Sequence, residues 1–149
     1  MNRIRRRFAD LTDGQVHMRY AGPTDRAPMV MIHQSPGSSK QLEPLMTALV
    51  ARGWRCIAPD TPGNGDSDPL PIDQPELPDL AQAAFVALSD VVDGPFDIYG
   101  SHTGASIAME IAIAHADRVP SLTIEGMGLY SGGLQSTVLD RYPREIRPG

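Results

Sequence analysis

The sequence predicts an α/β fold with a doubly wound, mostly parallel sheet. Short apolar runs typical of buried strands alternate along the chain with longer segments in which apolar residues recur every three or four positions. Such alternation implies right-handed crossovers between parallel strands, with ligands bound beyond the carboxyl ends of those strands. With 149 residues, of which 41% are hydrophobic, the chain can form one domain with a core but not two.

Six segments have the composition of strands, because they are short, rich in apolar residues and bounded by turn-forming residues. They cover residues 5–11, 15–20, 28–32, 55–58, 96–99 and 121–124. The turn pair Asp13-Gly14 joins the first two segments as an antiparallel hairpin, which we expect at the edge of the sheet. The continuous apolar run 28–32 is typical of the buried middle of a parallel sheet.

Three segments between these strands have the three-four spacing of a buried helix face. The first runs from Lys40 to Gly53, the second is expected to be capped by Asp79, and the third follows residues 100–104. Helices in these places would cover the sheet.

Composition excludes several classes of protein. The chain has 13 basic and 18 acidic residues, and the net charge of −5 disfavours nucleic acid as the main ligand. No run approaches the ~20 apolar residues of a membrane span, and no apolar signal region starts the chain. Cys56 is the only cysteine, so no internal disulfide forms and a buried, inert thiol is expected. These features predict a cytoplasmic protein without a membrane partner.

The most informative segment is Gly100-Ser101-His102-Thr103-Gly104, which directly follows a predicted strand. Small residues two places before and after a central residue allow a sharp strand-to-helix turn that projects the central side chain into a pocket. The two glycines meet this requirement around His102. Centring the turn on Ser101 would place Tyr99 where only a small side chain fits. Centring it on Thr103 is sterically possible but starts the turn one residue late, so Thr103 is the alternative to His102.

Three motifs in register resemble those of the α/β-hydrolase superfamily, and the likeness runs from about Gln15 to Glu125. Residues 33–39, His-Gln-Ser-Pro-Gly-Ser-Ser, look like the His-Gly-x-Pro oxyanion loop of that family. Residues 58–67 resemble the end of its next strand, and residues 100–104 match its nucleophile elbow. The position of His102 normally carries serine. The resemblance implies a hydrolase fold with its site at the carboxyl ends of the strands.

Backbone donors are expected beside this turn. If an acyl group is attacked at His102, negative charge appears on its oxygen and must be met by fixed hydrogen-bond donors. The N–H groups of Ser35 and Thr103 are the candidates. Gly37 is expected to permit a close turn that leaves the pocket open.

Other polar residues have structural interpretations. We expect the ring of His33 to hydrogen-bond the backbone of its loop, as part of the scaffold. Asp60 and Asp66 are interpreted as turn formers, because aspartate bonds its own backbone in glycine-rich turns. His17 and His115 fall at an expected sheet edge and helix end, so both are predicted at the surface.

Three roles remain open for His102. An imidazole is largely neutral at pH 7 and needs no separate base, so His102 acts either as a nucleophile that forms an acyl-imidazole or as a general base that activates water. A substituted nucleophile is also what a non-catalytic relative would show. Glu125, at the end of the last predicted strand, is placed where some family members, such as haloalkane dehalogenases, carry their catalytic acid, and is the candidate carboxylate that orients the ring.

The resemblance covers only the first half of the family fold, so the sheet is expected to be incomplete at its C-terminal side. A cap, two more strands and a late catalytic histidine normally follow. We therefore expect a second polypeptide to supply these elements, with residues 134–149 as a boundary segment leading toward the cap. Self-association by exchanged edges and cleavage from a longer precursor are the alternatives.

The resulting functional hypothesis is a hydrolase of a small apolar ester or lactone, formed as one half of a split two-chain enzyme. The alternative is a non-catalytic subunit that binds a ligand or stabilises a partner. No metal or cofactor is predicted, because the sequence shows no histidine and cysteine cluster with metal-ligand spacing and no GxGxxG after the first buried strand.

Overall fold

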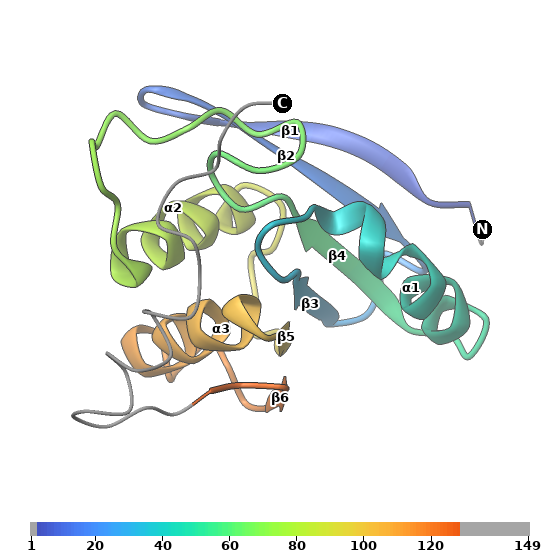
Figure 1. The fold of residues 1–149 in the computed structure, drawn as a ribbon. Helices are drawn as coiled ribbons and strands as arrows, with labels where there is room; N and C mark the ends of the chain where they lie inside the picture. Colours follow the sequence, from blue (N-terminus) through green and yellow to red (C-terminus); the bar gives the residue numbers. More distant parts are fainter. Residues whose placement is uncertain (1–2, 129–149) are drawn as a thin grey trace.

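The computed structural model describes residues 3–128, which form one mixed sheet with helices on both faces (Figure 1). The strands are β1 (Arg5–Leu11), β2 (Gly14–Ala21), β3 (Pro28–Ile32), β4 (Arg55–Pro59), β5 (Asp97–Ser101) and β6 (Leu122–Glu125). The helices are a 3-10 turn (Ser39–Leu42), α1 (Glu43–Val50), α2 (Leu77–Ser89) and α3 (Thr103–Ala114). The predicted α/β class is confirmed. The predicted boundary segment 134–149 lies outside the described residues.

The sheet is parallel except at one side. Its order is β1-β2-β4-β3-β5-β6, with β1 antiparallel to β2 and β2 antiparallel to β4. The pairs β3–β4, β3–β5 and β5–β6 are parallel. Because these four strands are parallel, β3, β4, β5 and β6 all end at the same edge of the sheet, and the loops that follow them lie together there.

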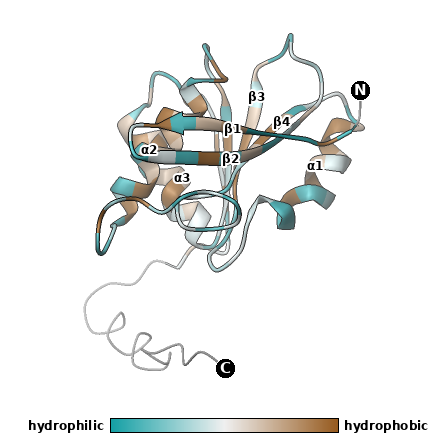
Figure 2. Ribbon diagram, turned by 90° about the horizontal axis from the view of Figure 1, so that it is seen from above, coloured by the Kyte–Doolittle hydropathy of each residue, from teal (hydrophilic) through white to brown (hydrophobic). Residues whose placement is uncertain are grey.

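Alternating side chains divide the core into two layers. In β3, Val30 and Ile32 face the core beneath α2 and α3, where Ile111 also packs. Met31 faces the other side, where it packs with Met46 of α1. Figure 2 shows α2 and α3 on one side of the sheet and α1 on the other. The continuous apolar run of β3 is therefore explained by burial on both faces.

The helix starts differ from the predicted ones. The helix expected from Lys40 begins as a 3-10 turn before α1 continues it. In α2 the N-cap is Glu76, and Asp79 lies at the third helical position, where each side chain bonds the backbone of the other in a capping box. Pro78 favours this earlier start because a first-turn residue needs no N–H partner. Within the described chain, no helix is long and apolar enough to cross a membrane.

The two edges of the sheet have opposite character. The β1 edge exposes the side chains of Arg5, Arg6 and Arg7, and charged side chains discourage pairing with another strand. The β6 edge is exposed along its whole length and includes Leu122 and Ile124 among the exposed large apolar residues. Of these two edges, β6 is therefore the one suited to accept a further strand.

Candidate functional site

A sharp bend joins β5 to α3 at His102. β5 ends at Ser101, α3 begins at Thr103, and His102 between them has φ 51° and ψ −114°. It is the sole residue other than glycine with positive φ between residues 3 and 128. A non-glycine residue holds such a conformation only where its surroundings enforce it, and such strain is typical of functional sites.

Two close backbone contacts enforce the bend. A Cβ on Gly100 would lie 2.3 Å from the carbonyl oxygen of Gly104, and a Cβ on Gly104 would lie 2.4 Å from the carbonyl oxygens of Ile32 and His33. The obstructing atoms belong to the backbone and cannot rotate away. Glycine is thus required at both positions, which lets the first turn of α3 press against the end of β3.

The imidazole of His102 is exposed at the carboxyl edge of the sheet. Its backbone N–H donates to the carbonyl oxygen of Glu125 at 2.8 Å. A Cβ on Gly126 would lie 2.6 Å from Cε1 of the ring, so the ring lies directly over that glycine. No other residue of the described chain hydrogen-bonds to the ring. Within residues 3–128, both ring nitrogens are consequently without a hydrogen-bond partner.

The carboxylate of Glu125 is engaged elsewhere. Its Oε2 accepts a hydrogen bond from the Tyr99 hydroxyl at 2.5 Å, on the strand next to β6. Burial, followed by this bond to the carboxylate, raises the pKa of Tyr99 above its usual value. Glu125 therefore contacts His102 through its main-chain oxygen, which accepts the backbone N–H of His102. No hydrogen bond joins the Glu125 carboxylate to the imidazole ring.

The two proposed backbone donors lie on adjoining segments. Thr103 is the first residue of α3, and a helix leaves its first N–H groups without internal partners. Ser35 is exposed in the loop after β3, where its hydroxyl donates to Oδ1 of Asn64 at 3.4 Å. Because Gly104 touches the carbonyl groups of Ile32 and His33, the start of α3 and the start of this loop meet at one place.

His33 connects two loops at this edge. Its buried ring places Nδ1 2.7 Å from the carbonyl oxygen of Gln34, and Nε2 accepts the backbone N–H of Thr61 at 3.0 Å. A neutral ring with its proton on Nδ1 satisfies both contacts. Burial lowers the pKa of His33, while the Gln34 carbonyl and Asp60 act in the opposite direction. The ring thus bonds loop backbone on both sides.

No main-chain contact requires glycine at position 37. A Cβ there would meet the amide end of Gln41, at 2.5 to 2.7 Å, and that side chain can move. The close turn expected to require glycine at this position is therefore not enforced by main-chain contacts.

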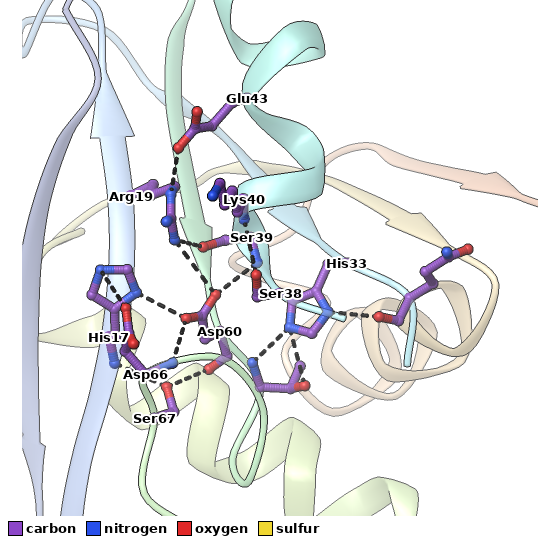
Figure 3. A network of polar contacts seen from close by, with 12 residues as sticks. His17, Arg19, His33, Ser38, Ser39, Lys40, Glu43, Asp60, Asp66 and Ser67 are labelled. Carbon is purple, nitrogen blue, oxygen red and sulfur yellow. Dashed lines mark hydrogen bonds and ion pairs between the residues drawn. The ribbon is translucent and has the colours of Figure 1, made fainter. Parts of the chain in front are cut away.

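Asp60 joins three segments through a buried network (Figure 3). Its Oδ1 accepts the backbone N–H of Ser39 at 2.6 Å, and its Oδ2 accepts from the backbone N–H of Asp66 at 3.0 Å and contacts Nδ1 of His17 at 2.9 Å. Arg19 lies 3.9 Å from Oδ1. Burial alone would raise the pKa of Asp60, but hydrogen bonds from Ser39, Asp66 and His17 outweigh it and hold this pKa below its usual value. Asp60 therefore does more than form a turn.

The predicted surface position of His17 is wrong. The residue is 1% exposed, because β2 is the second strand of the sheet and not its edge. The ring of Phe8 on β1 also covers it, with 5.2 Å between the two ring centroids. Sequence reasoning missed this site because Asp60, which directly follows β4, comes 43 residues after His17.

His115 also differs from its prediction. Its ring is stacked on Phe85 of α2, at 3.4 Å and 4° between planes, because the end of α3 packs against that helix. Cys56, by contrast, is buried as expected, and burial raises the pKa of its thiol to about 11. The thiol is therefore protonated and unreactive at neutral pH.

The Asp60 network generates a test of stability against pH. Because the folded-state pKa of Asp60 is lowered, its ionised form stabilises the fold above the unfolded value of ~3.9, and this contribution is lost as pH falls through the folded pKa. Asp60→Asn is expected to lower the free energy of unfolding by ~3 kcal/mol at pH 7 and by less at pH 3. Urea denaturation of both proteins measures this difference, with the exposed Asp73→Asn as a neutral control. A gap that stays constant with pH would contradict the assignment.

Comparison with known proteins supports one family. A family profile described as the alpha/beta hydrolase fold matches residues 27–139. The chain is 33% identical over 134 residues to 2-hydroxy-6-oxononadienedioate/2-hydroxy-6-oxononatrienedioate hydrolase 2 of Pseudomonas putida, covering 82% of this chain and 45% of that protein. It is 35% identical over 94 residues to a pimeloyl-[acyl-carrier protein] methyl ester esterase of Neisseria meningitidis, covering 63% of this chain and 34% of the esterase.

The solved structures agree. The epoxide hydrolase CorEH superposes with a TM-score of 0.78 at 26% identity, over 95% of this chain and 47% of the enzyme. The chain spans less than half the length of these relatives. The matched profile, covering most of the residues that carry the sheet, the bend and the neighbouring loops, shows that the chain belongs to the α/β-hydrolase superfamily.

Proposed function

We propose that this chain provides the bend and oxyanion loop of a hydrolase that acts on a small apolar ester or lactone, with His102 as the reacting residue. The observation that carries the proposal is the strained backbone of His102, held by two glycine contacts. Strain of this kind is costly, and here it places an imidazole with no hydrogen-bond partner among the described residues at the carboxyl edge of the parallel strands. The relatives named above include an esterase and an epoxide hydrolase, which supports hydrolysis as the reaction class.

In the nucleophilic route, a neutral ring nitrogen of His102 attacks the carbonyl carbon of the substrate. The N–H groups of Ser35 and Thr103 donate to the oxyanion that forms. The alcohol leaves with the proton lost by the ring, which leaves an acyl-imidazole, and water then releases the acid and restores the imidazole. In the general-base route, the ring removes a proton from water, which attacks the carbonyl directly. A burst of alcohol before the steady state distinguishes the first route from the second.

Glu125 has a positioning role in this proposal. Its main-chain oxygen accepts the N–H of His102 and thereby helps to fix the bend. Orientation of the ring by the carboxylate would require that carboxylate to leave the hydroxyl of Tyr99.

The alternative function is a non-catalytic subunit that binds a ligand or stabilises a partner. One observation favours it: among residues 3–128, no carboxylate hydrogen-bonds to the ring of His102, whereas such a bond supports imidazole chemistry in histidine-based catalytic sites. The two hypotheses differ in whether removal of the ring abolishes turnover.

Substitution of His102 tests the enzymatic proposal. His102→Ala, assayed in the native complex on chromogenic esters of short acyl chains, is expected to lose at least ~100-fold in kcat/KM, because the reacting nitrogen is gone. Thr103→Ala keeps the backbone donor and removes only the alternative hydroxyl, so its rate should stay close to that of the wild type. Equal rates for His102→Ala and the wild type would reject the catalytic role, and a loss only in Thr103→Ala would move the role to that hydroxyl.

We also propose that a second polypeptide supplies the C-terminal strands and cap. One feature supports this, the exposed edge of β6 with its apolar residues Leu122 and Ile124. An added strand would pair along β6, while the arginine-bearing edge of β1 would stay solvated.

Mass spectrometry of the purified protein under native and denaturing conditions tests this partnership. We expect a native complex that separates into this chain and a different, larger chain when denatured. Complexes made of this chain alone would favour self-association instead. A stable monomer of 149 residues would contradict the shared site.

A further inference from the structure

A second polar site, which does not include His102, lies where β2 meets the loop that follows β4 (Figure 3). His17, Asp60 and Asp66 each offer one ligand atom there, and these three atoms lie within 4.8 Å of one another. His17 is 1% exposed, yet its Nε2 is buried without a hydrogen-bond partner. This nitrogen lies 4.0 Å from Oδ2 of Asp66.

The partners of Asp60 determine which nitrogen of His17 carries a proton. Oδ2 of Asp60 lies 2.9 Å from Nδ1 of His17 and, as an ionised carboxylate oxygen, can only accept. Nδ1 therefore donates, and Nε2 faces the carboxylate of Asp66 and presents its lone pair there whenever it carries no proton. A buried nitrogen without a partner is costly, and here it faces a carboxylate oxygen of Asp66. A cation bound between these two atoms would satisfy both of them.

We propose that Nε2 of His17 and the carboxylate of Asp66 bind a divalent transition-metal ion, with zinc as the best match to one imidazole and one carboxylate ligand. Bonds from zinc to nitrogen and to oxygen are each about 2.0–2.2 Å, and a tetrahedral zinc therefore holds two such ligand atoms about 3.4 Å apart. These two atoms lie 4.0 Å apart, so the exposed Asp66 carboxylate would move toward the buried ring by about half an ångström on binding. Asp60 serves as the carboxylate that orients the ligating imidazole from its other nitrogen, an arrangement common in metal sites. The Asp66 side chain is 60% exposed, which leaves room for water as the remaining ligands.

The surroundings suit a cation that enters from the Asp66 side. Phe8 lies against the ring of His17, and the nearby guanidinium of Arg19 is offset by Glu43, to which it donates at 2.8 Å. The ion would fasten β2 to the loop that also presents Thr61 to His33. Metal binding would thus stabilise the loops beside the bend without contacting His102.

Zinc binding by the intact protein tests this site. In metal-free buffer, isothermal titration with Zn²⁺ is expected to show one site per chain and a rise in Tm at saturation. Asp66→Asn removes an exposed ligand without disturbing the core, and we expect at least a tenfold weaker affinity and no shift in Tm. Asp73→Asn, an exposed aspartate of the same connection, is the matched control and should bind as the wild type does. His102→Ala should bind equally well, which separates this site from the bend.

Two outcomes would overturn the metal site. One is the absence of stoichiometric zinc binding by the wild-type protein. The other is equal affinity in Asp66→Asn and the wild type, which would assign the zinc to other groups.

Discussion

The approach of the first turn of α3 to the end of β3 is the constraint on which the candidate site depends. Gly104 touches two carbonyl groups of β3 and its loop, and Gly100 touches the turn from the other side. The chain can change from strand to helix within one residue only because neither position has a Cβ. His102 absorbs the change in direction, which explains its positive φ and the exposure of its ring.

A second group of interactions fixes the loops that surround this bend. Asp60 holds β2, the turn before α1 and its own loop, and His33 ties that loop to the one carrying Ser35. Asp60 and His33 both act through buried hydrogen bonds, and a buried network whose groups are paired rigidifies the segments that it joins. The bend therefore supplies a reactive side chain, and the network supplies a rigid frame at the same edge of the sheet.

Local patterns were enough to predict the strands, the helices and the bend, because period, turn residues and glycine spacing are recorded in neighbouring residues. The order of the strands is not recorded in that way. His17 was assigned to an edge because its hairpin is local, whereas β4 pairs with β2 only through a long-range contact. The hydrogen bond between Tyr99 and Glu125 likewise depends on a pairing between distant segments. The register of β5 against β6 places both side chains on one face of the sheet, and this register cannot be predicted from neighbouring residues. The prediction of Asp79 as the N-cap of α2 fails for a local reason. The actual N-cap is Glu76, and Asp79 at the third helical position pairs with it in a capping box.

Acylation of the histidines by diethyl pyrocarbonate, located by peptide mass spectrometry, tests the central claim most directly. The reagent acylates accessible neutral imidazoles, which is the chemistry proposed for His102. The claim predicts that His102 reacts first in the folded protein, while His17 and His33, each 1% exposed, stay unmodified until the chain unfolds. Protection of His102, together with modification of either buried ring, would contradict the bend on which the proposed site rests.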